Sequence, residues 1–346
     1  MKHIIGVNPP PVSPQVKTLA VEEDGAGQRL DNYLMRHLKG VPKTHVYRII
    51  RSGEVRVNKG RASADTRLAL GDLVRLPPVR VSERAEQKTQ AMAAQAGHFV
   101  PAKDFPVLFE DEYFLALNKP AGVAVHGGSG VSFGVIEQLR MARPHAQYLE
   151  LVHRLDRETS GILLVAKRRS ALKNLQDQFR ERETGKTYLA LVLGSWPANK
   201  KVLDKSLAKY LLPGKGGEEG ERRVKVVAKD DPDAMPSLTM VKVREANEAY
   251  SLLEVTIKTG RTHQIRVHLA SEGWPIAGDD KYGNFEVNKA LARDVGVKGT
   301  EGLKRMFLHA WRLQCNHPST GKRVEIQADL PPELMQFLVH AMPETP

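Results

Sequence analysis

The stretch from Leu149 to Lys167 reads LELVHRLDRETSGILLVAK, and the interpretation of the rest of the chain depends on it. Two short apolar runs rich in Leu, Ile and Val flank the polar segment HRLDRETSG, and runs of this length and composition predict buried strands. The polar segment is therefore expected to be a loop that is held at both ends. Loops of this kind often carry functional residues.

Asp156 lies in the middle of this loop, between Arg154 and Arg157. Nearby positive charges favour the ionised form of a carboxylate, so the sequence predicts a charged Asp156 that can serve as a base or a nucleophile. The same spacing also fits a structural role, in which Asp156 and Thr159 close a turn or cap a helix. The local sequence leaves both interpretations open.

The segment HRLDRETSG resembles the HRLDxxTSG signature of the RluA-type pseudouridine synthases, with every fixed position filled in order. In that family the Asp of the signature is catalytic, and it corresponds to Asp156. GKTYLALVLG resembles a second family motif, whose Tyr packs on the target base and corresponds to Tyr188. TGRTHQIRVHL resembles a third motif, which supplies a basic partner to the Asp, and Arg266 is expected to be that partner.

The composition predicts a folded protein with a polyanionic partner. The 346 residues suffice for two domains, and 52 Lys and Arg against 40 Asp and Glu give a formal net charge of +12. Such a charge indicates nucleic acid, although a merely basic surface also fits. The single cysteine, Cys315, excludes an internal disulfide and a CxxC metal site. No apolar run approaches the roughly 18 to 20 residues of a membrane span, so a cytoplasmic protein without membrane contact is expected.

Residues 1–27 break into prolines and are expected to be a flexible tail. Residues 28–78 show two helical patterns followed by the strand-like GEVRVN, and this order resembles the S4 RNA-binding domain. Basic side chains on one helix pair favour phosphate contacts, although any single one of them fits a solvated face. The residues expected to bind RNA in this unit are Arg29, Lys43, Arg48, Arg51 and Arg56.

Residues 79–104 are polar and rich in alanine, which predicts a linker. The remainder, residues 105–346, is expected to be the catalytic domain, and its segment NKPAGVAVH resembles the family's first motif. The glycine-rich HGGSG that follows matches no nucleotide-binding template and is interpreted as a flexible turn or one that faces RNA. The charged region from Lys200 to Pro236 predicts a long hairpin or insertion that is too polar to be core.

The patterns and the resemblance together imply an α+β fold. A small S4-like domain is joined by a linker to a pseudouridine synthase domain, whose mixed, mainly antiparallel sheet is flanked by helices and loops. Ser170 is expected to cap one helix. THQIRVHLASEG predicts another that ends at Gly273 and buries Ile265 and Leu269.

The resemblance implies an isomerase that acts without a cofactor on 23S ribosomal RNA or its large-subunit precursor. It breaks the N1–C1' bond of a uridine, turns the uracil and rejoins it through C5, after the nucleotide has left its stack. Asp156 then acts on the ribose or starts the elimination, Arg266 neutralises it, and Tyr188 stacks on the base. Further contacts to phosphates or bases are expected from Arg154, Arg261 and His263.

Two other classes of protein compete with this interpretation. A non-catalytic S4-type RNA-binding or ribosome assembly protein explains the charge but leaves the three motifs without a purpose. An aspartate-dependent hydrolase needs a second carboxylate as its acid, and none is evident in the motifs. The histidines at 153, 263 and 268 lack a zinc-ligand spacing, so no metal is expected. No apolar helix face is left over, so a monomer is expected.

Overall fold

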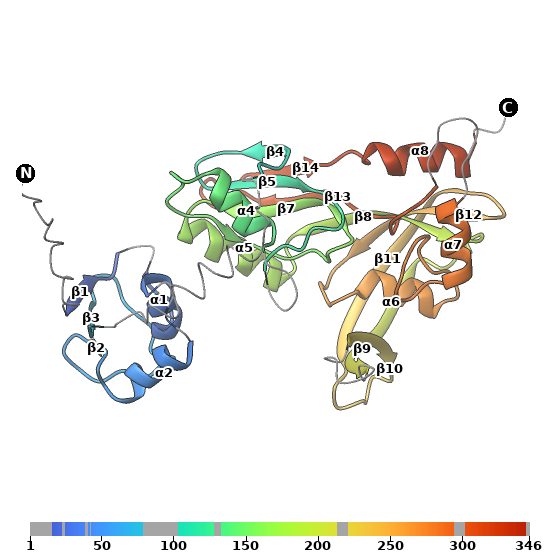
Figure 1. The fold of residues 1–346 in the computed structure, drawn as a ribbon. Helices are drawn as coiled ribbons and strands as arrows, with labels where there is room; N and C mark the ends of the chain where they lie inside the picture. Colours follow the sequence, from blue (N-terminus) through green and yellow to red (C-terminus); the bar gives the residue numbers. More distant parts are fainter. Residues whose placement is uncertain are drawn as a thin grey trace, which may run out of the picture. The chain divides into compact units, whose positions relative to one another are not determined.

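The computed structural model describes residues 16–22, 25–38, 41, 43–78, 103–127, 133–212, 221–293 and 302–343. The chain divides into two compact units, residues Met1–Phe99 and Val100–Pro346 (Figure 1). The first 15 residues of the expected tail and most of the expected linker lie outside the described residues, as does part of the glycine-rich turn. The domain limits given above therefore stay a prediction. No helix in the described ranges has the length and apolar character needed to cross a membrane.

The first unit combines a small sheet with two helices. Strands β1 (Lys17–Ala20), β3 (Leu73–Leu76) and β2 (Arg56–Val57) pair antiparallel in that order. Helices α1 (Leu30–His37) and α2 (Lys43–Arg51) supply most of the core. Of the three leucines that set the helical spacing in the sequence, Leu30 and Leu34 are fully buried. The third, Leu38, is half-buried at the C-cap of α1. The two predicted helical patterns are thus confirmed.

The second unit is built on one large sheet. The order of its main path is β10-β9-β11-β12-β8-β13-β7-β5-β4, with β14 on β13 and β6 on β7 (Figure 1). Every pairing is antiparallel except that of β13 with β7, so the sheet is mixed and mainly antiparallel, as predicted. The strands are β4 (Val107–Glu110), β5 (Phe114–Lys119), β6 (Glu150–Leu151), β7 (Ser160–Ala166), β8 (Gly185–Leu193), β9 (Val202–Leu212), β10 (Glu221–Val227), β11 (Met235–Ala246), β12 (Tyr250–Ile257), β13 (Leu308–Asn316) and β14 (Arg323–Gln327).

Helices α4 (Val135–Ala142) and α5 (Arg169–Glu181) cover opposite faces of β5 and β7. Leu163 packs in the cluster that includes α4, whereas the next residue, Leu164, packs in the cluster that includes α5. Successive side chains of a strand point to opposite faces, so the continuous apolar run of β7 supplies both cores. This explains why the run in the sequence does not alternate.

The expected cap at Ser170 is wrong. Helix α5 begins at Arg169, its N-cap is Arg168 in an extended conformation, and no side chain caps the helix. The Arg168 side chain instead forms an ion pair with Glu112 and lies 4.9 Å from the ring centre of Tyr113. Because the helix begins at Arg169, Ser170 falls inside its first turn.

Three further helices, α6 (Gln264–Ser271), α7 (Phe285–Arg293) and α8 (Pro332–Ala341), pack on the other half of the sheet. The predicted helix that ends at Gly273 corresponds to α6, and Gly273 follows its last turn with a φ of 95°. Ile265 and Leu269 are buried, as expected. Arg266 is buried as well, with 2% of its surface exposed.

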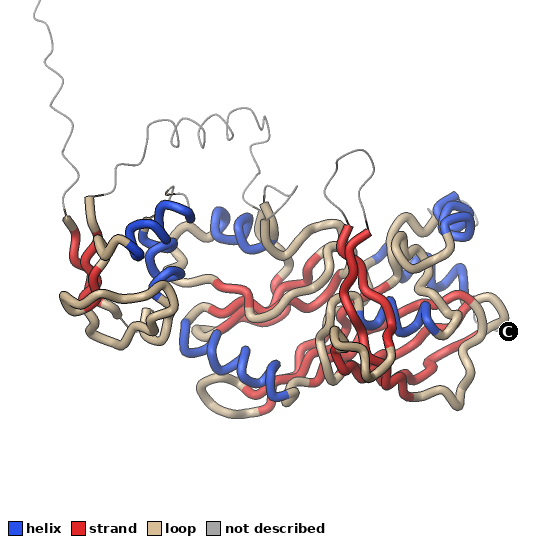
Figure 2. Tube along the Cα trace, turned by 90° about the horizontal axis from the view of Figure 1, so that it is seen from below, coloured by secondary structure: helices blue, strands red, loops and turns tan. Residues whose placement is uncertain are grey.

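The charged region from residue 200 contains the predicted hairpin, formed by β9 and β10, which run side by side (Figure 2). The expectation that this region is too polar for the core is wrong. Strand β9 pairs with β11 of the main sheet, and Leu207 packs with Val224 and with Val267 of α6. Ser206, Leu207 and Ala208 in the middle of β9 are buried one after another, and the charged residues lie on either side of them. Because successive residues point to opposite faces, the middle of the strand is covered on both faces although its overall composition is polar.

Candidate active site

The loop of residues 152–159 connects β6 and β7, which pair with each other as the two apolar runs predicted. Its turn is closed by the backbone, because the N–H of Thr159 donates to the carbonyl oxygen of Asp156 at 3.1 Å. At the end of the loop Gly161 has a φ of 107°, and a Cβ there would lie 2.3 Å from the carbonyl oxygen of Ala310. Only glycine allows β7 to approach β13 this closely. The turn therefore leaves the Asp156 carboxylate available to the cleft.

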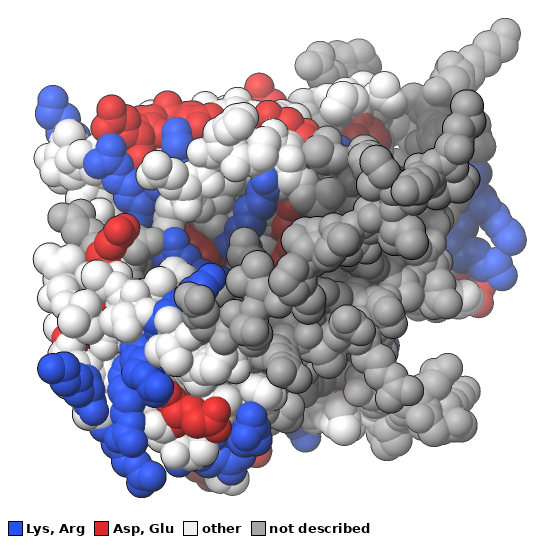
Figure 3. Space-filling model, turned by 60° about the vertical axis from the view of Figure 1, so that its left-hand side comes forward, with Lys and Arg blue, Asp and Glu red and all other residues white. Residues whose placement is uncertain are grey.

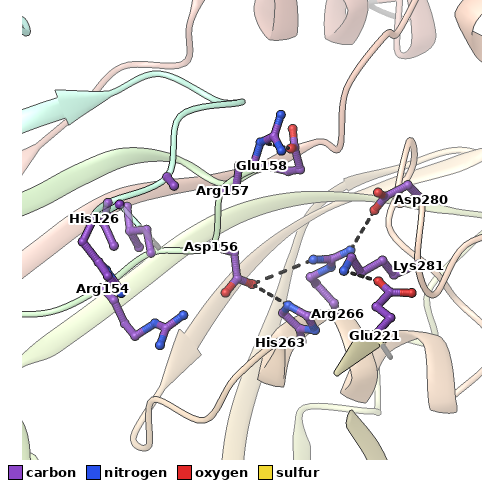
Figure 4. A pocket seen from close by; sticks show the side chains of 14 residues that line it. His126, Arg154, Asp156, Arg157, Glu158, Glu221, His263, Arg266, Asp280 and Lys281 are labelled. Carbon is purple, nitrogen blue, oxygen red and sulfur yellow. Dashed lines mark hydrogen bonds and ion pairs between the residues drawn. The ribbon is translucent and has the colours of Figure 1, made fainter. Parts of the chain in front are cut away.

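Two side chains of the third motif approach Asp156 (Figure 4). Arg266 Nη1 and His263 Nε2 each lie 3.9 Å from Asp156 Oδ2, and the Asp156 side chain is 22% exposed. Of the two arginines that flank Asp156 in the sequence, Arg157 is engaged elsewhere. Arg157 forms an ion pair with Glu158 and donates to the carbonyl oxygen of Gly122. The partner of Asp156 is instead brought by α6, which lies more than 100 residues further along the chain.

These residues line a cleft made of two adjoining hollows. Both hollows share Arg154, Leu155, Asp156, His263 and Arg266. The larger one, of about 510 Å³, also includes His126, Arg157, Glu158, Glu221, Asp280 and Lys281 (Figure 4). The smaller one adds Tyr188, Ile257, Arg261, Gln264 and Leu308, among others. The structure thus brings together every cleft residue that the sequence proposed, since Asp156, Tyr188, Arg266, Arg154, Arg261 and His263 all line it.

Tyr188 lies on β8, beside the cores that support the cleft from two sides. Burial is the main cause that raises the pKa of its hydroxyl, and the charge of Asp156 raises it further. A phenol in this environment stays protonated at neutral pH. Tyr188 can therefore present a neutral ring and a hydroxyl to a bound base, but it does not rest as an anionic base.

The guanidinium of Arg266 is fixed by Asp279, which sequence reasoning missed. Arg266 Nε and Nη2 donate to the two Asp279 oxygens at 2.7 and 2.6 Å, and Nη2 also donates to Asp280 at 3.1 Å. This bidentate pair leaves Nη1 for Asp156. Burial opposes ionisation of Asp279, but the hydrogen bonds and charge of Arg266 outweigh it and lower the Asp279 pKa. The sequence carried one signal for this pair. A buried Arg on a helix requires an acidic partner, and the segment GDDKYG, residues 278–283, supplies two aspartates shortly after the helix.

Lys119 is a second residue that the sequence did not single out. Its side chain is fully buried at the end of β5, and burial lowers its pKa to about 7. Its ammonium group connects the first motif to the loop that carries Asp156, since both segments supply acceptors. It donates to the carbonyl oxygens of Pro120 (2.8 Å), Val123 (2.8 Å) and Arg157 (3.0 Å).

Three more carboxylates line the cleft. One of them, Glu158, lies within HRLDRETSG, so the expectation that the motifs hold no second carboxylate is wrong. A glycoside hydrolase needs one carboxylate as its acid. Each of the three instead faces a cationic side chain. The pairs are Glu158 with Arg157, Glu221 with Lys281 and Asp280 with Arg266.

The other two histidines that were considered as zinc ligands, His153 and His268, have structural contacts. His153 Nε2 accepts the N–H of Leu164 at 3.1 Å, and its ring stacks on Phe179. His268 is buried, and its two ring nitrogens lie at hydrogen-bond distance from Ser237 and Thr239. Within the described ranges, no three His, Cys, Asp or Glu side chains are grouped as metal ligands.

The residues of the first unit that are proposed to bind RNA differ in their exposure and in their ion-pair partners. Arg29 is held by Asp31, which is itself 4% exposed, through a bidentate pair at 2.8 and 3.2 Å. Arg48 forms an exposed ion pair with Glu54. Arg51 is exposed on α2 and Arg56 is half-buried on β2, while the side chain of Lys43 lies outside the described residues. On the face drawn in Figure 3, Lys and Arg form exposed groups, in keeping with the net charge.

A buried hydrogen-bond chain at the end of the Asp156 loop predicts acid sensitivity. Arg305 Nη2 donates to Ser160 Oγ at 2.7 Å, Ser160 Oγ lies 2.8 Å from His309 Nδ1, and His309 Nε2 lies 3.0 Å from the Ala328 carbonyl oxygen. The hydroxyl accepts from Arg305, so it donates to a neutral His309. Burial lowers the pKa of His309 from 6.5 to about 4.

We expect the free energy of unfolding to fall by up to about 3 kcal/mol between pH 6.5 and pH 4 because of this histidine. The unfolded chain binds the proton first, since the folded pKa is the lower one, so acid favours unfolding. Urea titrations at a series of pH values measure the effect. The variant His309→Gln should show a flatter pH dependence over this window, and an unchanged slope would exclude His309 as its source.

Comparison with known proteins agrees with this geometry. Residues 113–271 match the family model described as RNA pseudouridylate synthase, and residues 28–74 match the S4 domain. Ribosomal large subunit pseudouridine synthase C of Yersinia pestis is 49% identical over 327 residues, which cover 94% of this chain and 96% of that protein. The Escherichia coli (strain K12) protein of the same name is 49% identical over 326 residues, which cover 94% of this chain and 97% of that protein.

Solved structures show the same fold. Human RNA Pseudouridylate Synthase Domain Containing 1 is 27% identical, with a TM-score of 0.51, and the match covers 72% of this chain and 98% of that one. Human RNA Pseudouridylate Synthase Domain Containing 4 is 23% identical, with a TM-score of 0.53, over 73% of this chain and 97% of that one. The predicted fold class is confirmed, and the chain belongs to the RNA pseudouridylate synthase family, with an S4 domain near its N-terminus.

Proposed function

We propose that this protein converts specific uridines of 23S ribosomal RNA to pseudouridine. One observation supports this function above the others: Asp156 faces a buried, pre-oriented arginine in a cleft that Tyr188 also lines. The chain is also similar over nearly its whole length to enzymes named for the large ribosomal subunit. Its S4 domain supports an RNA partner.

Asp156 would attack C1' of the ribose or remove a proton from the sugar to start an elimination. Either route breaks the N1–C1' bond, and the bond from C5 to C1' forms after the uracil has turned. The proton lost from C5 balances the proton gained at N1, so the reaction needs no oxidant or reductant. Arg266 stabilises the Asp156 carboxylate when bound RNA excludes water, because charge interactions strengthen in a drier site.

The target nucleotide must leave its stack to reach Asp156, at a cost of a few kcal/mol. Tyr188 offsets part of this cost if its ring stacks on the extruded uracil, since base–aromatic stacking contributes about 1–3 kcal/mol. Arg154 and Arg261 are exposed and line the cleft, which suits contacts to the flanking phosphates. We propose these roles for all three side chains.

Base-resolved pseudouridine mapping tests the function. 23S ribosomal RNA from cells that lack the protein should lose pseudouridine at defined positions, and the purified protein should restore it at the same positions in vitro. Unchanged maps would favour a non-catalytic assembly role. Release of free uracil without pseudouridine would instead indicate a hydrolase that cleaves the glycosidic bond.

Deleting residues 1–78 should weaken binding of ribosomal RNA and reduce its salt dependence. Each lost phosphate contact lowers the slope of log K against log salt by about 0.7 to 0.9. The measurement is a binding titration at several salt concentrations, with the full chain as the reference. An unchanged slope would show that the S4 domain does not contact phosphates in this complex.

A further inference from the structure

We propose that Tyr282 is a positioning residue, which fixes His263 as a neutral N–H donor directed at Asp156. The inference deepens the proposed function, on which its catalytic part rests. Its structural part concerns only which ring nitrogen of His263 carries the proton. That part can be measured without RNA and without turnover.

The ring of Tyr282 contacts the ring of His263, which lines both hollows of the cleft. His263 Nδ1 lies 2.8 Å from the Tyr282 hydroxyl oxygen, and the rings are in edge contact at an interplanar angle of 71°. The opposite ring nitrogen, Nε2, lies 3.9 Å from Asp156 Oδ2 (Figure 4). The imidazole therefore bridges Tyr282 and Asp156.

The hydrogen bonds determine the direction of this bridge. The N–H of Val224 donates to the Tyr282 hydroxyl oxygen at 3.1 Å, so that oxygen is already an acceptor. The phenolic proton needs an acceptor of its own, and among the described residues His263 Nδ1 is the one at hydrogen-bond distance. A neutral imidazole carries one proton, so Nδ1 accepts from Tyr282 and Nε2 carries the N–H.

The electrostatic surroundings of His263 favour this neutral form. Burial is the main cause that lowers its pKa, and the positive charges of Arg266 and Lys281 lower it further, against the opposing effect of Asp156 and Asp279. At neutral pH the ring thus presents Nε2–H to Asp156 without adding a second positive charge to the cleft.

One loop holds both partners of Asp156. The backbone N–H groups of Lys281 and Tyr282 donate to Asp279 Oδ1 at 2.9 and 3.0 Å, and the same carboxylate holds Arg266. Residues 279–282 therefore fix the guanidinium through Asp279 and the imidazole through Tyr282. The loop is held in turn by β10, from which Arg223 donates to the Lys281 carbonyl oxygen at 2.8 Å.

Two cationic or N–H-bearing side chains approach the Asp156 carboxylate at one of its oxygens. Both Arg266 Nη1 and His263 Nε2 approach the same oxygen, Oδ2. In both contacts Oδ2 is the oxygen that faces the partner nitrogen, and we assign the other oxygen, Oδ1, to the ribose. Hydrogen bonds at active sites are often long before substrate binds and shorten in the complex, so the 3.9 Å separation suits a donor that engages when RNA enters.

Three substitutions test the contributions of the two ring nitrogens of His263 separately. In His263→Gln the amide nitrogen can reach the place of Nε2, whereas in His263→Asn the shorter amide can reach only the place of Nδ1. The backbone at His263 is left-handed, with a φ of 53°, and Asn tolerates this conformation better than Gln. The backbone is therefore less strained in the His263→Asn variant than in the His263→Gln variant. If His263→Gln is nevertheless the more active variant, the difference must come from the position of its amide group. Tyr282→Phe removes the hydroxyl alone.

We expect single-turnover pseudouridine formation on 23S ribosomal RNA to fall about 10- to 100-fold in His263→Asn, the range for a lost hydrogen bond to a charged group. Tyr282→Phe should lose only about two- to five-fold, because a mixture of tautomers still contains the form with Nε2–H. His263→Gln should retain at least about ten times the rate of His263→Asn. The RNA dissociation constant should stay within about two-fold in all three variants. Tyr113→Phe is the matched control, since Tyr113 packs against His317 outside the cleft, and it should keep the full rate.

Nitrogen NMR of the full chain labelled at histidine gives the independent readout. The signal that disappears in His263→Gln identifies residue 263, and in the unsubstituted chain it should report a protonated Nε2 and a bare Nδ1. Tyr282→Phe should shift it toward a mixture of both tautomers. A protonated Nδ1, or equal rates for the Gln and Asn variants, would overturn the proposal. If the unsubstituted protein forms no pseudouridine, the proposed function fails, while the tautomer remains measurable.

Discussion

Replacing Asp156 by Asn should abolish pseudouridine formation, with a loss of at least about 10⁴-fold in single-turnover rate. The amide has nearly the same shape as the carboxylate, but it can neither attack C1' nor remove a proton. Loss of a positioned base or nucleophile typically costs 10²- to 10⁴-fold or more. RNA binding should remain close to that of the unsubstituted protein, because the cationic residues of the cleft are unchanged. The measurement pairs single-turnover kinetics with a binding titration.

The fold should survive this substitution. The Asp156 carboxylate is partly exposed and lies 3.9 Å from its nearest partners, while Arg266 stays bound to Asp279. Glu158→Gln is the matched control, since it neutralises another carboxylate of the same cleft and should cost less than about ten-fold. Substantial turnover by Asp156→Asn, or an equal loss in both variants, would remove Asp156 from the chemistry.

Replacing Asp279 by Asn should have the largest effect on stability. The side chains of Arg266 and Asp279 are 2% and 1% exposed, so the substitution leaves a buried guanidinium without its main counter-charge. Breaking a buried pair by removing one partner typically costs about 3–5 kcal/mol. We expect a decrease of this size in the free energy of unfolding of the catalytic unit, measured by urea titration. Turnover should fall as well, since Arg266 would no longer be held in place toward Asp156.

Asp280→Asn provides the control within the same loop. Asp280 also contacts Arg266 Nη2, at 3.1 Å, but its side chain is 66% exposed. Solvent-exposed ion pairs contribute about 0–1 kcal/mol, so this variant should unfold almost like the unsubstituted protein. If the two variants lost equal stability, the buried pair would not be what holds the loop.

Asp279 is the buried partner of Arg266 and Asp280 is an exposed one, and the sequence did not show which aspartate has which role. GDDKYG contains both residues side by side, and nothing in the local pattern distinguishes them. Their burial differs because the turn of residues 279–282 folds around the Asp279 carboxylate, which accepts two backbone N–H groups. The difference therefore arises from the folded turn and from α6, which carries Arg266.

Several features followed directly from the order of residues. The apolar runs on each side of HRLDRETSG predicted two strands and a loop between them, and the leucine spacing predicted the helices of the S4 domain. These patterns are local, since periodicity along the chain reports which face of an element is buried. The resemblance of three motifs implied the fold class and the pairing of Asp156 with Arg266, which the sequence alone could not place at 3.9 Å.

The amino-acid sequence by itself thus determined the strands, the helices and the residue types that the cleft contains. The tertiary structure decided which charges meet. Arg157, the neighbour of Asp156 in the chain, pairs elsewhere, whereas Arg266 arrives from a distant helix and Lys119 binds the loop from β5. The physical reason is that a charge removed from water must find a partner within a few ångströms. Distances of that size depend on how the sheet and helices pack, and adjacency in the chain does not set them.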